Sequence, residues 1–228
     1  MTGRLDQYFD EMGRNKEQGS GFCQECSLRK NHRGPVLVNC AIASPDVILV
    51  SESPGGRPQD TADLVDWTAS VLRSCHEKSS GDLSSARDMG YFIGALTRGK
   101  IYSANDGTRS QVLYWTHTVK CFIQREDKGI RQTKKEGKQD FESAVEACSN
   151  YLREEMAIVN PKPKLVVAVG TTVAGRKLRE LSLVENMCEV YHPGARLSKE
   201  KKEERLKILQ KKVEELDLGS ILPGPLTP

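Results

Sequence analysis

Residues 46–55, with the sequence DVILVSESPG, decide the fold class of this chain. The run 47–50 is apolar at every position, which is typical of a strand buried on both faces of a parallel sheet. A Ser/Pro/Gly loop follows it directly. We therefore expect a parallel sheet that ends here in a tight loop, at the edge where such sheets bind their ligands.

Strand and helix patterns alternate over the rest of the chain. Apolar runs at 112–119, 164–169 and 189–191 predict three further strands. Alternating strands and helices predict the α/β class, with helices on both faces of a parallel sheet. The predicted helices, from apolar residues at helical spacing, are 1–20, 61–75, 140–159, 171–181 and 199–216.

Length and composition favour one folded unit. The chain has 228 residues and a net charge of +3, and we expect a single domain over 1–218 with a flexible Pro/Gly-rich tail at 219–228. No apolar run approaches the ~20 residues of a membrane-spanning helix, and the polar start does not resemble a signal peptide. We expect a monomer in the cytoplasm or nucleoid, not bound to a membrane.

One segment between the second and third strands is strongly basic. It suits a phosphate backbone, and it equally suits a solvated loop. Its basic residues are Arg125, Lys128, Arg131, Lys134, Lys135 and Lys138.

The seven cysteines indicate a metal or cluster site more than disulfides, because their number is odd and no export signal precedes them. The pair Cys23-x2-Cys26 fits zinc, redox or cluster sites. Together with Cys121 and Cys148 it makes a four-thiolate set, which suits both zinc and iron–sulfur. The remaining three, Cys40, Cys75 and Cys188, are expected to be buried small apolar residues.

Polar residues follow the predicted strands at what should be one edge of the sheet. Glu52 and Ser53 follow the first strand, His117 lies in the second, and His192 follows the last. His192 is either a turn residue or a donor to a ligand. Ser53 either holds a water or caps a turn.

The order of these motifs resembles the family 4 uracil-DNA glycosylases from about residue 23 to 209. This resemblance implies a three-layer α/β/α sandwich with a four-stranded parallel sheet. It also implies a [4Fe–4S] cluster bound by Cys23, Cys26, Cys121 and Cys148, with a structural role. The matching pieces are residues 23–26, 47–55, 116–121, 148–152, 166–170 and 191–193.

The resemblance further implies a hydrolase of DNA repair that flips uracil, or another deaminated base, out of DNA and cuts its N-glycosidic bond. His192 matches the histidine that donates to the base oxygen, where charge develops. Glu52 matches the acid that shapes the pocket and helps to place water. Backbone amides around Ser53 and Gly55 are expected to donate to the base or a phosphate.

Several expected base contacts depart from the family pattern. The family sequence Gly-Glu-Ala-Pro-Gly is here Ser51-Glu52-Ser53-Pro54-Gly55. Leu64 stands where the family has an aromatic ring, so stacking worth about 1–3 kcal/mol is lost. His117 stands where an Asn reads uracil through a paired donor and acceptor, which one imidazole does not offer. We expect the substrate-binding residues to be Ser51, Gly55, Leu64 and His117.

Three functions remain open from the sequence: a DNA glycosylase, a glycosylase-fold protein that binds DNA or RNA without excision, and a zinc-stabilised enzyme acting on a free nucleotide. The sequence does not determine the accepted base, or whether the strand is single or double.

Overall fold

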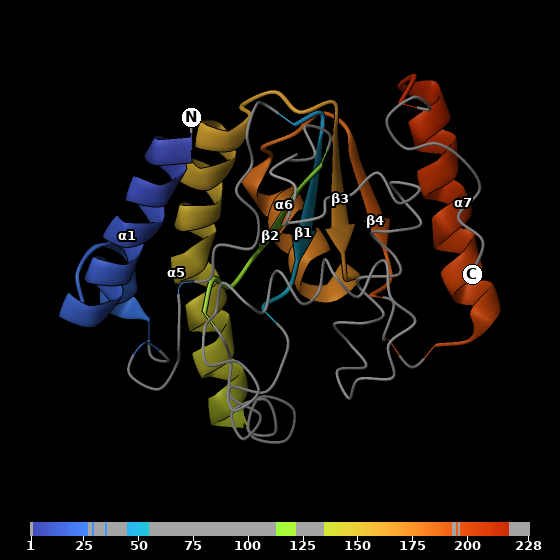
Figure 1. The fold of residues 1–228 in the computed structure, drawn as a ribbon. Coiled ribbons are helices and arrows are strands. Elements are labelled where there is room, and N and C mark those ends of the chain that lie inside the picture. Colours follow the sequence, from blue (N-terminus) through green and yellow to red (C-terminus); the bar gives the residue numbers. More distant parts are fainter. Residues whose placement is uncertain are drawn as a thin grey trace, which may run out of the picture.

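Four parallel strands form one sheet in the order β2-β1-β3-β4 (Figure 1). The computed structural model describes residues 2–26, 29, 35, 45–54, 113–121, 135–192, 195 and 197–218, with backbone only at 2–3, 113, 135–140, 199, 202 and 206. The strands are β1 Val47–Ser51, β2 Leu113–His117, β3 Leu165–Val169 and β4 Met187–Val190. β1 lies between β2 and β3, and all five of its residues are buried, as its unbroken apolar run predicts.

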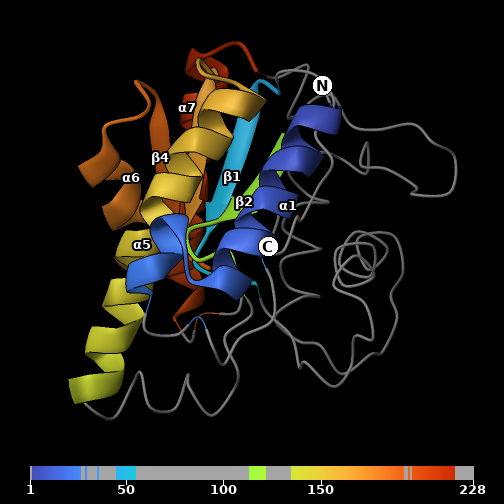
Figure 2. The same cartoon turned by 90° about the vertical axis from the view of Figure 1, so that its left-hand side faces the viewer.

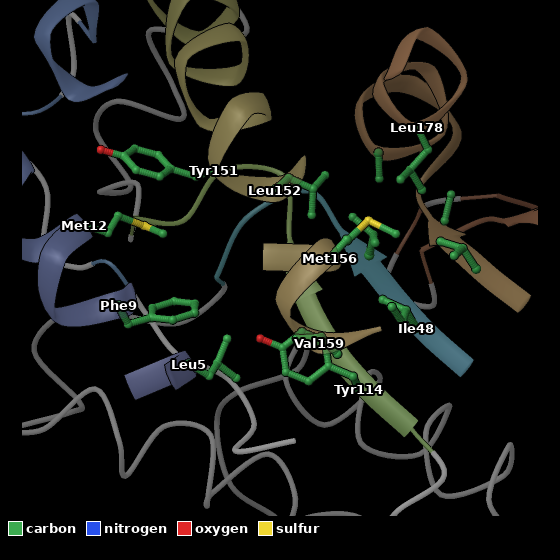
Figure 3. Packing of buried hydrophobic residues seen from close by; sticks show 14 of the residues in the cluster. Leu5, Phe9, Met12, Ile48, Tyr114, Tyr151, Leu152, Met156, Val159 and Leu178 are labelled. Carbon is green, nitrogen blue, oxygen red and sulfur yellow. The ribbon is translucent and has the colours of Figure 1, made fainter. Parts of the chain in front are cut away.

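One face of the sheet is covered by α1 Thr2–Gln18, α5 Lys135–Val159 and α6 Arg176–Leu181. Apolar side chains from these helices meet those of the strands in one core cluster (Figure 3). Figure 3 shows α1 and α5 contributing several side chains each to this core. The labelled core residues are Leu5, Phe9, Met12, Ile48, Tyr114, Tyr151, Leu152, Met156, Val159 and Leu178.

The opposite face is covered at β4 by α7, Lys199–Glu215. Leu209 and Val213 of α7 are buried there, together with Cys188 and Val190 of β4. In Figure 2 α5 crosses in front of the sheet and α7 lies behind it. The strands therefore lie between two helical layers, which confirms the predicted α/β fold with a four-stranded parallel sheet.

β3 is joined to α6 through an unusual turn. Gly170 follows β3 with φ of 109°, a backbone conformation that side chains disfavour. A π-helical turn, Thr171–Gly175, comes next, and π turns occur often at functional sites. Gly170 N–H donates to Val190 O at 2.9 Å, so this turn stays attached to the end of β4.

The element boundaries differ modestly from those predicted. β4 begins at Met187, two residues before the predicted start, because a half-buried edge strand need not be continuously apolar. α5 begins at Lys135 instead of residue 140. In the last helix and just after it, Leu209, Val213 and Leu218 are buried, whereas Leu216 is half-buried.

Two predicted segments, 61–75 and 219–228, lie outside the described residues, and the domain boundary stays a prediction. Within the part of the chain that is described, no helix has both the length and the apolar character to cross a membrane.

Candidate functional site

Three separate segments bring Cys23, Cys26, Cys121 and Cys148 to one side of the sheet. Cys23 lies in the 3₁₀ turn Gly21–Glu25 and Cys26 ends it, Cys121 follows β2, and Cys148 lies within α5. Burial raises the pKa of Cys121 well above its ordinary value, and the other three thiols raise it further. Burial also raises the pKa of Cys148 to about 12, with contributions from Cys26 and Cys23. The four sulfurs thus lie within electrostatic reach of one another.

The turn with Cys23 is held on α5 by contacts that do not involve the sulfurs. Ser143 Oγ donates to Glu25 O at 3.1 Å. Tyr8 OH on α1 donates to Tyr151 O at 2.8 Å, and the rings of Phe22 and Tyr151 meet edge to face at 4.9 Å. The protein itself therefore fixes the N-terminal cysteine pair beside Cys148.

The chemistry of this donor set fits an iron–sulfur cluster, which cysteine thiolates bind. Among the described residues, no group of three or more His, Cys, Asp or Glu side chains is arranged to hold a metal ion. A cluster of several irons keeps its ligand sulfurs farther apart than a single ion does. The four cysteines therefore suit a cluster in the chemical type of their donors, and a bound cluster stays a prediction.

A buried ion pair lies beside the cysteines. Lys120 and Glu155 pair with side chains only 1% and 0% exposed. Tyr114 OH donates to Glu155 Oε1 at 2.5 Å, and Lys120 Nζ donates to Thr116 Oγ1 at 2.8 Å. These partners satisfy charges that would otherwise be costly to bury.

The sequence interpretation missed this pair, because Lys and Glu are rarely fully buried. One signal was present: Glu155 lies seven residues after Cys148, on the apolar side of α5.

Glu52 and His192 lie at the carboxyl edge of the sheet, on either side of β3. In the register, Ser51 pairs with Val169, which pairs with Val190. Glu52 and His192 are thus about two strand spacings apart, or about 10 Å. Both side chains are half-buried.

Gly170 lies between these two positions in the strand order, and a Cβ added there would meet no atom of the described residues within 4 Å. As far as the described residues go, there is thus open space directly beside the Cα of Gly170.

The β1 and β2 ends continue their pairing past the strands. Thr118 N donates to Ser51 O at 2.8 Å and Val119 N donates to Glu52 O at 2.9 Å. The backbone of Glu52 is therefore fixed by the same loop that leads to Cys121. Ser53, the next residue, is half-buried.

Ser51 and His117 lie side by side at this edge, on the sheet face opposite the main core. The Ser51 hydroxyl accepts from Trp115 Nε1 at 2.9 Å and donates to Thr116 O at 3.4 Å. The His117 ring is 5.2 Å from the Trp115 ring and only 1% exposed. The hydroxyl of Ser51 thus joins β1 to β2, and a substrate contact by either residue stays a prediction.

The segment after β4 is anchored to α7. Arg205 lies over the ring of Tyr191 at 5.5 Å from its centroid, a favourable cation–π contact. His192 O accepts from Ala195 N at 2.8 Å, which turns the chain toward α7. These contacts restrict the position of His192.

Several predicted positions lie outside the described residues. They include Gly55 and Leu64 of the expected base site, Cys40 and Cys75, and the side chains of the basic segment. Cys188 is buried in β4 as expected, and burial raises its pKa to about 11.

Comparison with known proteins gives one family. The sequence model of the uracil DNA glycosylase superfamily matches residues 39–216, which is most of the chain. The match includes Glu52, Cys121, Cys148 and His192, whereas Cys23 and Cys26 precede it. No curated protein matches the chain.

Proposed function

Because this chain belongs to the uracil DNA glycosylase superfamily, we propose that it hydrolyses the N-glycosidic bond of uracil or another deaminated base in DNA. We place it among the iron–sulfur members of family 4, as a divergent one. The observation that carries the proposal is the placement of Glu52 and His192 on either side of Gly170, at the carboxyl edge of a parallel sheet. Base excision repair is the process that such an activity serves.

The reaction needs a base that has left the stack. Extrusion exposes the glycosidic bond and presents the base edge to the protein. The room beside Gly170 supports a position for the base there, because the backbone can approach a planar ring without an intervening side chain.

Two charges develop when the bond breaks, and the two sides of this site suit them. The departing base takes up negative charge, which a hydrogen bond from the His192 imidazole to a base oxygen stabilises. The sugar becomes cation-like at C1′, and a water held by Glu52 adds there. The water oxygen bonds to C1′, the C1′–N bond breaks with its electrons on the base, and Glu52 accepts the water proton. The backbone amide of Ser53 supplies a further donor for the base or a phosphate.

The thiolates of the four cysteines are proposed to hold a [4Fe–4S] cluster. The cluster would have a structural role and would transfer no electrons during base removal. Cys23 and Cys26 tie the N-terminal segment to Cys121 and Cys148. The loop from His117 to Cys121 also bonds to Ser51 and Glu52, so ordering the sulfurs also orders this edge of the sheet.

The proposed partner is DNA, bound by a monomer in the cytoplasm at the nucleoid. The basic segment 125–138 follows Cys121 in sequence and suits the phosphate backbone.

One observation favours a second candidate function, nucleic-acid binding without excision. The His117 ring is 1% exposed and lies against Trp115, where the family places an amide that reads uracil. A base reader must reach the ligand, so His117 in this position is a poor substitute for that amide.

A base-release assay separates the two functions. Cluster-loaded full-length protein is incubated with single- and double-stranded DNA containing uracil, hypoxanthine or xanthine, and abasic product and binding are both measured. We expect an abasic product from at least one substrate. Salt-sensitive binding with no abasic product would instead support binding alone, and stoichiometric zinc without iron would contradict the cluster.

A further inference from the structure

The loop that carries Cys121 is fastened to α5 by a fully buried ion pair. Lys120 directly precedes Cys121, and Glu155 lies about two helical turns after Cys148 on the same helix. Tyr114 and Thr116 of β2 complete the network by binding Glu155 and Lys120. The Lys120–Glu155 pair thus connects the segments that present two of the four sulfurs.

Lys120 is held at the site by these contacts. Its side chain is only 1% exposed, and its ammonium is bound by the Glu155 carboxylate and the Thr116 hydroxyl. Because Cys121 is the next residue in sequence, the positive charge of Lys120 is fixed close to the segment that presents this sulfur.

Stability alone does not explain this pair. Buried ion pairs can often be replaced by apolar residues of similar volume with no loss of stability, because both charges must be removed from water. A role in positioning the adjacent sulfurs therefore explains the presence of this ion pair better than stability does. Hydrogen bonds to ligand sulfurs and nearby charge are among the properties that set the reduction potential of an iron–sulfur cluster.

We propose that Lys120 is a positioning residue of the four-cysteine site, held by Glu155 and Tyr114, which fixes Cys121 relative to Cys148 and supplies a buried positive charge beside the ligand sulfurs. The proposal rests on the cluster put forward under the proposed function. It adds residues that contact and orient the segments carrying the cysteines. It also gives a role to the Lys120 ammonium, which is the positive charge of this network.

The test compares the reconstituted full-length protein with K120M, K120R and the double variant K120M/E155Q. Iron and sulfide per chain, the rate of cluster loss to a chelator, and the reduction potential are measured. We expect K120M to bind its cluster about 10–100-fold more weakly than the wild type, the usual effect of removing a residue that supports the ligands, and to lose it faster to the chelator. Its potential should become more negative, because a positive charge that favours the added electron is gone. K120R keeps the charge and should restore a potential near that of the wild type.

The double variant separates positioning from folding. K120M leaves Glu155 buried without its cation, which can unfold the protein, whereas K120M/E155Q removes both charges and keeps an oxygen for Tyr114. We expect the double variant to recover thermal stability but not the slow cluster loss, and its potential should lie between those of K120M and the wild type, because the negative charge of Glu155 is removed as well. Wild-type cluster retention in the double variant would overturn the proposal, as would a wild-type chain that binds no iron.

Base release is measured on the same samples, so that the two proposals can fail separately. A cluster-bearing wild type that releases no base contradicts the glycosylase activity and leaves the role of Lys120 in place. A K120M chain with unchanged potential and retention contradicts the role of Lys120, whatever its activity.

Discussion

The indole N–H of Trp115 donates to the hydroxyl of Ser51 at 2.9 Å, and this bond joins β2 to β1 at the carboxyl edge of the sheet. Ser51 occupies a position where the related family has glycine, which offers no such acceptor. Ser51 directly precedes Glu52, so this bond helps to fix the backbone position from which the proposed catalytic carboxylate extends.

We therefore expect S51A to lower the free energy of unfolding by about 1–3 kcal/mol, because the buried indole N–H loses this acceptor. Denaturant unfolding measures the change. A double-mutant cycle with W115F is the control, since the cost of S51A should shrink once the indole is absent. An equal cost of S51A in both backgrounds would show that the bond does not matter.

Substitution of single cysteines tests the proposed ligand set, with a buried cysteine outside that set as the control. C23A, C26A, C121A and C148A should each reduce iron and sulfide per chain strongly, because each removes one proposed thiolate. C188A is the matched control, since Cys188 is buried like Cys23 and Cys148 but lies in β4. Iron analysis and visible absorption measure the result, and cluster loss in C188A would show that the ligand set is wrong.

Gly170 offers a test of the room between Glu52 and His192. With φ of 109°, G170A should cost about 1–3 kcal/mol of stability through backbone strain alone. Its methyl group would also enter the space where the base is proposed to lie, so base release should fall more than stability explains.

The control for this change is G13A, in the middle of α1. Its added methyl would meet Pro35 Cδ at an ordinary 3.8 Å, and an alanine in a helix is favoured by about 0.5–1 kcal/mol. G13A should thus raise stability and leave base release unchanged. Unimpaired base release in folded G170A would contradict the proposed position of the base.

The sheet could be predicted from sequence because its signals are local. The run 47–50 is apolar at every position, a pattern typical of a strand covered on both faces. The apolar residues at helical spacing in 140–159 are an equally local signal, and four of them, Val145, Cys148, Leu152 and Met156, are buried on α5. The start of β4 was placed too late because its edge position leaves alternate residues half-buried.

The buried network could not be predicted in the same way. A single Lys or Glu normally indicates a solvated surface, and burial becomes possible only when both partners and their acceptors meet in space. Lys120 and Glu155 are 35 positions apart in sequence and share no local pattern. Likewise, the use of the Ser51 hydroxyl depends on Trp115 of the neighbouring strand, which the sequence of β1 alone does not reveal.

The most direct measurement is the single-turnover rate of base release from saturating uracil-containing DNA by wild type, H192A and H32A, each loaded with cluster. We expect release by the wild type, a rate lower by about 100- to 1000-fold in H192A with DNA binding nearly unchanged, and no effect of H32A, a histidine without a proposed role. Equal rates in wild type and H192A, or no base released by any of the three, would contradict a catalytic site between Glu52 and His192.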